Sequence, residues 1–478
     1  MKKEFCALLG ILSLAVPPLV AADAKPAAKP NVLFIVIDDL NDYISLLQNY
    51  PGVKTPNLDK FAKSAMTFTR AYCAAPICNP SRTAFISGIA PYRSGIYENN
   101  QRMTTSQLVV DSVLLPEQFK RAGYHTMWNG KFFHSEPGQQ RREKMWDDTE
   151  GGKGVYGPRA KNDVIPASVH RPPMFNYGAW DGPDTDFSDY NHMLINEKRL
   201  AKKYDQPFFM VFGIYRPHNP WTAPKRFFDM HPLDTLVMPN VPTNDLDDVP
   251  AIAREYAHYP VSLQALKDAG QWKPVVQSYL ASISFTDYNL GRVLEALDQG
   301  PNRDNTIVCI VADNGFHMGE KEHFAKYALW EQTTHILCAW RVPGMTAPGS
   351  VCTATINLLD LYPTFNELCN LPPVSQQLDG QSLVPLLKNP KSEWNLPAVT
   401  TYRQNDHAVR DNRWRYIRYH DGSEELYDEL NDPHEWTNVV ARPENATVKD
   451  RLAQWLPKEN AAPPAPARKR ANADADEE

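Results

Sequence analysis

The chain has 478 residues, a formal net charge of −6, 42% apolar residues and 22% charged residues. This length allows one large domain with a smaller partner, or two domains, and the composition is typical of a globular protein. The mildly acidic balance excludes a generally basic nucleic-acid binder, although local groups of Arg and Lys can still bind an anion.

The N-terminus has the pattern of an export signal. Lys2 and Lys3 precede the apolar run FCALLGILSLAVPPLVA, and small residues follow at Ala22 and Ala24. This order predicts a signal peptide over residues 1–24, because the run is short for a membrane span. No later stretch is apolar enough to span a bilayer. We therefore expect an exported protein, periplasmic or secreted.

Export makes disulfides possible, and six of the seven cysteines follow the predicted signal peptide. The sequence does not choose among their pairings. None of them forms a CxxC pair, which disfavours a zinc knuckle. Cys309 lies inside an apolar run and is expected to be a small buried hydrophobic residue.

Buried strands and amphipathic helices alternate along the chain. Continuous apolar, β-branched runs predict strands covered on both faces at residues 32–37, 207–214 and 306–312. Helices are predicted at residues 56–66, with Asn57 as a possible cap, at 114–122, ended by Gly123, and at 277–298. This alternation predicts an α/β sandwich with a largely parallel sheet.

The composition of the sequence changes near residue 378, and a stretch of aromatic and charged residues follows. The stretch RWRYIRYHDGSEELYD places a DG turn between two strand-like runs, which predicts a small antiparallel unit. The Pro- and Ala-rich end, with its clustered charges, predicts disorder. We therefore divide the chain after the signal into a main domain at 25–377, a C-terminal subdomain at 378–457 and a disordered tail at 458–478.

Two of the predicted strands end in a pair of oxygen-bearing side chains. Asp38 and Asp39 follow the first run, and Asp313 and Asn314 follow the third. In open α/β sheets, ligands bind beyond the carboxyl ends of the strands. Either pair alone could simply mark a turn. Together, at equivalent positions, they favour a hard divalent cation, calcium or magnesium rather than zinc.

A third group of polar residues surrounds Cys78 in the stretch ICNPSRTAFISG. Pro80 suits the first turn of a helix, and Gly88 can end it. Cys78 would then stand just before a helix N-terminus, where an anion is favoured, with Arg82 about one turn away. This setting favours a reactive or modified residue, and a catalytic thiolate stays an alternative.

The pentapeptide CNPSR matches the C-x-P-S-R signature of type I sulfatases. Between residues 30 and 440 the chain also carries, in order, GKFFH, YRPHNPW, ADNGFHMGE, FAKY and EELYDELNDPHEWTN. The chain thus resembles this family, and within it the iduronate-2-sulfatase group. The resemblance implies an alkaline-phosphatase-like α/β sandwich, with a large mixed, mainly parallel central sheet flanked by helices and a smaller C-terminal antiparallel sheet.

The resemblance also implies a modified nucleophile. A maturation enzyme would oxidise Cys78 to Cα-formylglycine, whose hydrate attacks sulfur with one hydroxyl and expels sulfate with the other. Arg82 would steady this group. One Ca²⁺ ion would be held by Asp38, Asp39, Asp313 and Asn314 and would touch residue 78. Fixed cations lower the barrier because sulfate transfer loads negative charge onto oxygen.

Four further residues receive roles by resemblance. Lys131 would bind sulfate and His134 would assist the diol, and their K-x-x-H spacing is that of the iduronate-2-sulfatase group, whereas most arylsulfatases have K-x-H. His218 would contact sulfate and protonate the leaving oxygen. Lys326 would bind sulfate. Without the resemblance, each would be read as an ordinary loop or surface residue.

The sugar subsite is less well defined. Its candidate residues, each equally compatible with a structural role, are Arg216, His317, Trp330, His407 and Arg410. Iduronate-2-sulfatase has Asp-His where this chain has Asp313-Asn314. Because Asn is still an oxygen ligand, this departure concerns the substrate more than the metal.

The sequence therefore predicts a calcium-dependent formylglycine sulfatase that releases inorganic sulfate from a sulfated carbohydrate. Three alternatives stay open. The first is a phosphonate monoester or phosphodiester hydrolase of the same superfamily. The second is a non-catalytic glycan-binding protein that keeps its thiol, and the third is a hydrolase that uses the Cys78 thiol directly.

Overall fold

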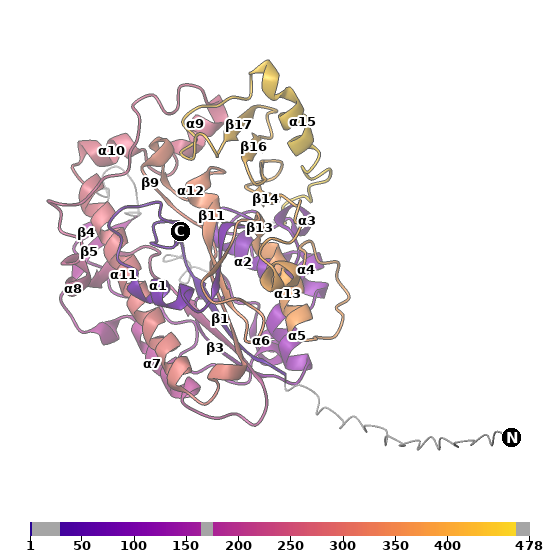
Figure 1. Cartoon of the computed structure of the whole chain (residues 1–478). Coiled ribbons are helices and arrows are strands. Elements are labelled where there is room, and N and C mark those ends of the chain that lie inside the picture. The colour runs from indigo at the N-terminus through magenta and orange to yellow at the C-terminus, as the bar shows by residue number, and fades with distance from the viewer. Residues whose placement is uncertain (2–28, 164–174, 465–478) are drawn as a thin grey trace.

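The computed structural model describes residues 29–163 and 175–464, together with Met1 (Figure 1). The predicted signal peptide lies outside these ranges, apart from Met1. Within them the largest element is an eight-stranded sheet with the order β12-β2-β11-β8-β1-β6-β3, and β13 also pairs with β2. No helix in the described ranges is long and apolar enough to cross a membrane.

The three predicted strands form the centre of this sheet. They are β1 (Asn31–Ile37), β6 (Phe208–Ile214) and β8 (Thr306–Ala312), and every residue in them is buried. β1 lies between β6 and β8 and is parallel to both, while β3 (His125–Gly130) continues the parallel part beyond β6. Burial on both faces explains why these strands are continuous apolar runs.

The other half makes the sheet mixed. β11 (His335–Arg341) is antiparallel to β8 and to β2 (Met66–Tyr72). The short strands β12 (Ser350–Cys352) and β13 (Ile356–Asn357) run parallel to β2. The predicted fold, an α/β sandwich with a mixed and mainly parallel sheet, is confirmed.

Helices cover both faces of the sheet (Figure 1). One layer contains α1 (Pro56–Ala62), α7 (Ser188–Leu200) and the long α11 (Trp272–Gln299). The other contains α2 (Cys78–Ser87), α5 (Leu115–Arg121) and α13 (Leu361–Leu368). The remaining helices are α3 (Pro91–Ser94), α4 (Gln107–Asp111), α6 (Gln139–Met145), α8 (Lys225–Phe228), α9 (Ala251–Ala257), α10 (Leu263–Asp268), α12 (Glu331–Thr334), α14 (Val384–Lys388) and α15 (Ala446–Ala453).

The start of α1 differs from the expectation that Asn57 caps it. The N-cap residue is Thr55, and Asn57 lies inside the helix. The free amides of the first turn are instead satisfied by Asp287 of α11, whose carboxylate accepts from the backbone N–H groups of Asn57 (3.0 Å) and Leu58 (2.8 Å). A carboxylate at a helix N-terminus also interacts favourably with the helix dipole. The cap therefore comes from a distant part of the chain.

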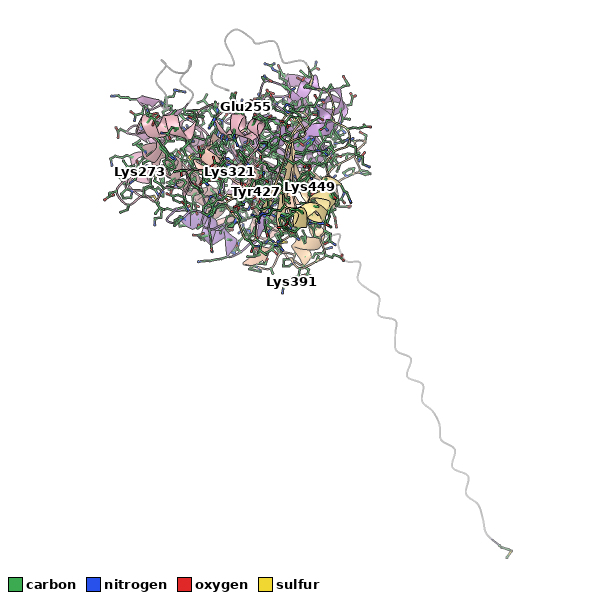
Figure 2. The ribbon with its side chains drawn as sticks, turned by 90° about the horizontal axis from the view of Figure 1, so that it is seen from above. Glu255, Lys273, Lys321, Lys391, Tyr427 and Lys449 are labelled. Atoms are coloured by element: carbon green, nitrogen blue, oxygen red, sulfur yellow. The ribbon has the colours of Figure 1, made fainter. Side chains whose placement is uncertain are left out.

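The C-terminal unit is a four-stranded antiparallel sheet. It consists of β14 (Ala398–Thr401), β15 (His407–Arg410), β16 (Trp414–Arg418) and β17 (Glu424–Asp428), in that order. The predicted DG turn joins β16 to β17, and Gly422 has a φ of +86° that suits glycine. Seen from above, Tyr427 of this sheet lies near Lys321 of the main domain, with Nζ 5.3 Å from the ring centre (Figure 2).

Three smaller elements complete the description. β4 (Asn162–Asp163), β5 (Asn176–Trp180) and β7 (Trp221–Pro224) form one sheet, and β9 (His317–Met318) pairs with β10 (Phe324–Ala325).

Residues 458–464, which the sequence analysis assigns to the disordered tail, lie against the main domain. Their Ala461 N–H donates to Tyr92 O (2.7 Å), and Tyr97 OH donates to Ala461 O (2.8 Å). The rest of the tail lies outside the described residues.

Candidate active site

The two acidic pairs lie side by side at one edge of the central sheet. β1 and β8 are parallel neighbours with Ile37 opposite Ala312, so their carboxyl ends coincide. Asp39 N–H donates to Asp313 Oδ1 (3.0 Å), and Asn314 Nδ2 donates to Asp39 Oδ1 (2.9 Å). Asp39 has a φ of +55°, which is uncommon for a non-glycine residue and is typical of strained positions at functional sites.

Cys78 lies directly beside these acids. It begins α2, rather than preceding it as the sequence suggested, and its buried Sγ is 3.4 Å from Asp39 Oδ1. Gly88 ends the helix with a φ of +72°, as expected. Ser81 Oγ donates to Asp313 O (2.6 Å), which fixes the first turn of α2 to the end of β8. This hydrogen bond between α2 and the end of β8 keeps Cys78 beside the acidic residues.

Arg82 joins the ends of the two strands. Its Nε donates to Asp313 Oδ2 (2.7 Å), and an Nη atom donates to Asp38 Oδ1 (2.9 Å). Charge-assisted bonds of this kind are about twice as strong as neutral ones. The guanidinium is 1% exposed, so neither pair is weakened by water. Arg82 therefore holds Asp38 and Asp313 at a fixed separation around Cys78.

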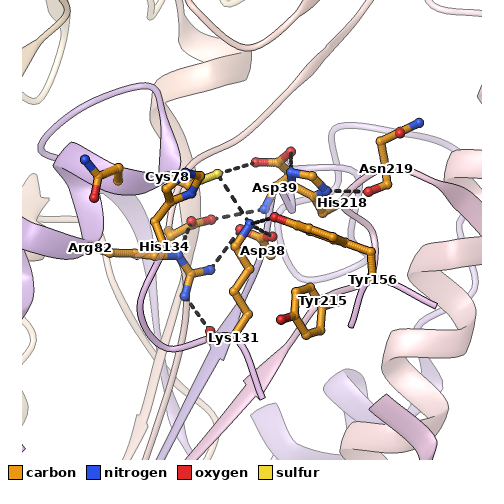
Figure 3. Close-up of polar contacts among 12 residues, drawn as sticks. Asp38, Asp39, Cys78, Arg82, Lys131, His134, Tyr156, Tyr215, His218 and Asn219 are labelled. Carbon is orange, nitrogen blue, oxygen red and sulfur yellow. Dashed lines mark hydrogen bonds and ion pairs between the residues drawn. The ribbon is translucent and has the colours of Figure 1, made fainter. Parts of the chain in front are cut away.

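Two lysines complete the group, and Figure 3 shows the first of them, Lys131. Lys131 Nζ lies 2.5 Å from Asp38 Oδ2 and 4.0 Å from Cys78 Sγ. Lys326 Nζ lies 2.8 Å from Cys78 Sγ and 2.9 Å from both oxygens of Asp39. A Cβ atom at Gly130 would lie 1.7 Å from Gly213 O, so the turn that delivers Lys131 requires glycine.

The two predicted histidines flank this group. His134 is 4% exposed, and burial together with Lys131 lowers its pKa well below the usual value. His218 Nδ1 lies 2.5 Å from Asn219 O, which assigns the hydrogen to Nδ1, and Nε2 lies 3.7 Å from Asp39 Oδ2. Burial and then Lys131 lower the pKa of His218 to about 3. Both imidazoles are therefore neutral at neutral pH in this arrangement.

The electrostatics favour a charged Asp38 and a neutral thiol, whereas burial raises the pKa of Asp313 to about 7. Burial opposes ionisation of Asp38, but Lys131, His218 and Arg82 hold its pKa well below the usual value. Burial raises the pKa of Cys78 well above its usual value, and the charges of Asp38 and Asp39 raise it further. A thiol in this state is a poor nucleophile, because the thiolate is the reactive form. The hypothesis of a thiol-dependent hydrolase loses support here.

The donors fit a divalent cation. Carboxylate oxygens of Asp38, Asp39 and Asp313 lie within 4.8 Å of one another, and the same holds for donor atoms of Asp38, Cys78 and His218. Asn314 Oδ1 is buried and has no hydrogen-bond partner among the described residues. Buried polar atoms without partners are rare, and a carbonyl oxygen beside three carboxylates suits a hard cation.

Sequence reasoning missed two tyrosines at this site. Tyr156 OH accepts from Lys131 Nζ (3.0 Å), and Tyr279 OH donates to Asp39 O (2.7 Å). Tyr279 is on α11 and supports the strained backbone of Asp39. Neither tyrosine lies in a recognisable motif. The glycines around Tyr156 indicate a tight loop in the sequence, but not the residue against which the loop packs.

The candidate sugar-binding residues have other partners. Arg216 is buried and donates to Thr222 O and to Thr222 Oγ1, so it holds a loop together. His317 pairs with Thr333 and His407 with Thr401. The remaining two form the contacts Arg410–Glu331, Arg410–Glu429 and Trp330–Glu425. Each of the five side chains thus has a partner within the protein, and a role in sugar binding stays a prediction.

Comparison with known proteins identifies the family. Residues 30–371 match the profile of the family Sulfatase, and residues 319–462 match that of N-sulphoglucosamine sulphohydrolase, C-terminal. The chain belongs to the sulfatase family. It is 36% identical to a sulfatase of Formosa agariphila over 96% of this chain and 93% of that protein. It is 28% identical to human iduronate 2-sulfatase over 71% of this chain and 69% of that protein.

Solved structures agree on the fold of this sulfatase. The phosphonate monoester hydrolase of Agrobacterium radiobacter superposes with a TM-score of 0.72 at 20% identity, covering 89% of this chain and 94% of that one. BT4656, in complex with its substrate D-glucosamine-2-N,6-O-disulfate, gives 0.70 at 20% identity, covering 89% and 96%. The resemblance found in the sequence motifs is thus confirmed for family and fold, and the protein is a sulfatase enzyme.

Proposed function

We propose that this sulfatase hydrolyses a sulfate ester of a sulfated carbohydrate and releases inorganic sulfate, with a site similar to that of iduronate-2-sulfatase. The observation that carries the proposal is the convergence of Lys131, Lys326 and Arg82 around Cys78 in a buried site. Fixed cations in such a site stabilise the negative charge that develops on the sulfate oxygens. The relatedness to human iduronate 2-sulfatase supports the carbohydrate class.

The proposed nucleophile derives from Cys78 by oxidation to formylglycine in a maturation enzyme. Support comes from the C-x-P-S-R signature and from the burial that keeps the thiol protonated. When formed, the hydrated aldehyde supplies a hydroxyl group in place of the unreactive thiol. Lys326, 2.8 Å from Sγ, and Arg82, through the acids, would hold residue 78 in position.

The proposed metal is a single calcium ion held by Asp38, Asp39, Asp313 and Asn314. An oxygen-only set of three carboxylates and one amide favours calcium or magnesium over zinc. When bound, the ion supplies positive charge to the sulfate group. Lys131 and Lys326 add two further charges. His218 carries its hydrogen on Nδ1, so Nε2 would first take up a proton, which the negative charge of a bound sulfate ester favours, and would then give it to the leaving oxygen.

The proposed location follows from the N-terminal pattern. Residues 1–24 have the order of a secretory signal, so we propose export to the periplasm or the medium. The sulfated carbohydrate would then be met outside the cytoplasm. The maturation enzyme is the second expected partner.

Two measurements on one preparation test these proposals. Mass spectrometry of the tryptic peptide AYCAAPICNPSR, after thiol alkylation, is expected to show Cys73 alkylated and Cys78 as an aldehyde. Release of sulfate and of phosphate is then compared for matched esters. Alkylation of both cysteines, in protein from a host that matures sulfatases, would contradict the formylglycine proposal. Faster release of phosphate would favour the phosphonate or phosphodiester alternative, and binding without release would favour the glycan-binding one.

A further inference from the structure

Tyr156 lies between the two groups to which the proposed function gives separate tasks. It belongs to the segment between α6 and β4 and is half-buried beside the acids and Cys78 (Figure 3). Its neighbours are Lys131, Tyr215 and His218. Lys131 is the proposed sulfate ligand, and His218 is the proposed donor to the leaving oxygen. The hydroxyl group of Tyr156 therefore contacts the residue proposed to bind sulfate, and its ring contacts the residue proposed to protonate the leaving oxygen.

The hydroxyl group binds the sulfate-binding lysine. Lys131 Nζ donates to Tyr156 OH (3.0 Å), lies 4.9 Å from the Tyr156 ring centre and also pairs with Asp38. A flexible four-carbon side chain with one strong anionic partner can rotate about that partner. A second partner, here a hydroxyl group, restricts the direction in which the ammonium group points. Tyr156 supplies that second partner.

The ring stacks on the imidazole. The ring centres of Tyr156 and His218 are 4.6 Å apart with an angle of 26° between their planes. The opposite restraint on His218 is the contact of Nδ1 with Asn219 O. A ring held on one face and at one nitrogen has one orientation left, with Nε2 directed at the acids. Tyr215 packs against Tyr156 at 4.7 Å and 67°, which restrains the tyrosine in turn.

The loop around Tyr156 is held on both sides. Val155 N–H donates to Ser188 Oγ (2.9 Å), and Tyr215 OH donates to Gly154 O (3.4 Å). Gly154 and Gly157 have positive φ angles of 75° and 96°. A Cβ atom at Gly154 would lie 2.5 Å from His192, and one at Gly157 would lie 3.0 Å from Arg216. The loop thus reaches this conformation only with glycine at these positions, which places Tyr156 precisely.

We propose that Tyr156 is a positioning residue that fixes Lys131 through its hydroxyl group and His218 through its ring, and so couples sulfate binding to protonation of the leaving group. The proposal rests on the function proposed above. It separates the two contacts into two testable parts. Loss of the hydroxyl group should weaken only the interaction of Lys131 with the sulfate group. Loss of the ring should also weaken protonation of the leaving oxygen.

The kinetic test compares Y156F, Y156L and the control Y204F. Tyr204 is a half-buried tyrosine remote from Cys78, and its hydroxyl donates to Arg199 O (3.0 Å). Substrates are aryl sulfates from 4-nitrophenyl sulfate to 4-methoxyphenyl sulfate, which differ in leaving-group pKa. Y156F is expected to lose about tenfold in kcat/KM on all of them, the usual effect of one hydrogen bond to a charged group. Y156L is expected to lose more as the leaving-group pKa rises, while Y204F stays within about twofold of the wild type.

A second readout does not require activity. Modification of His218 by diethyl pyrocarbonate, followed by peptide mass spectrometry, is expected to be at least about threefold faster in Y156L and unchanged in Y156F. Equal labelling rates, or equal losses on all substrates together with a lowered Tm, would overturn the proposal. If the wild type releases no sulfate, the proposed function fails, and the labelling rates still decide the role of Tyr156.

Discussion

This sulfatase contains two buried clusters of ion pairs, each with both positive and negative side chains, and the two clusters have different roles. The first, the active-site cluster, pairs Arg82, Lys131 and Lys326 with Asp38, Asp39 and Asp313. The second, the interface cluster, pairs Arg410 and Arg415 with Glu331, Glu429 and Glu435 between the C-terminal sheet and α12. Both are almost entirely shielded from water, so composition and burial do not distinguish them.

The difference lies in what the charges surround. In the interface cluster, Arg415 is occupied by Glu435 (2.7 Å), Glu429 (3.2 Å) and Leu329 O (3.0 Å). In the active-site cluster, both lysines also reach Cys78 Sγ, and the side-chain oxygen of Asn314 accepts no hydrogen bond from the part of the chain that the structure describes. A buried charge cluster thus becomes an active site when its charges converge on a reactive atom and its donors keep coordination capacity. Otherwise it joins two parts of a fold.

The largest expected effect comes from removing the central atom of the active-site cluster. Cys78→Ala should lower kcat by at least about a thousandfold, since no other group can supply the nucleophile. Thermal unfolding should change little, because the substitution leaves the pairs Lys131–Asp38 and Lys326–Asp39 in place. The matched control is Cys73→Ala, five residues away and also buried. A C78A variant with more than a few per cent of wild-type sulfate release would contradict the assignment.

Breaking the interface cluster should act on stability rather than on chemistry. Arg415→Leu leaves Glu435 buried without its cation and leaves Glu331 with Arg410, which we expect to cost about 3–5 kcal/mol in the free energy of unfolding. Urea denaturation measures the loss, and kcat per folded molecule should be unchanged. The control is Arg413→Leu, whose pair with Asp428 is solvent-exposed and should contribute nothing measurable. A loss of kcat without loss of stability would place Arg415 in the active site instead.

The same comparison explains which features could be predicted from the sequence. The apolar runs of β1 and β8 and the acids that follow them are local patterns, and parallel pairing brings them together. The contact of Arg410 with Glu331 could not be predicted, because the two residues are far apart in the sequence. Tyr156 and the Asp287 cap of α1 were missed for the same reason. Long-range contacts between single polar residues leave no periodic pattern in the sequence.

Removal of the metal should affect the active-site cluster and leave the interface cluster unchanged. Dialysis against EDTA is expected to lower both the activity and the Tm. An ion whose free concentration is a hundred times its dissociation constant stabilises the folded state by about 2.7 kcal/mol, and its removal takes this away. Calcium should restore both better than magnesium does. In an Asp313→Asn variant the Tm should respond less to calcium, whereas R415L should respond like the wild type. An EDTA-treated enzyme that keeps full activity, with no metal found by elemental analysis, would exclude the proposed ion.

The smallest expected effect is a pH dependence that arises in the interface cluster. Burial raises the pKa of Glu435 to about 7, and burial together with the charge of Glu331 raises the pKa of Glu429 well above its usual value. The folded protein then binds protons more tightly than the unfolded chain. Stability from Glu435 is therefore fully present below about pH 4.5, the ordinary pKa of a glutamate, and is lost as the pH rises from there through about 7. Glu429→Gln cannot ionise. It should match the wild type near pH 4 and exceed it by about 1.4 kcal/mol near pH 5.5 in urea denaturation, because each pH unit above the ordinary glutamate pKa costs about that much. An unchanged slope of stability against pH would show that Glu429 is already ionised in the folded protein, and the interface cluster would then carry its full negative charge.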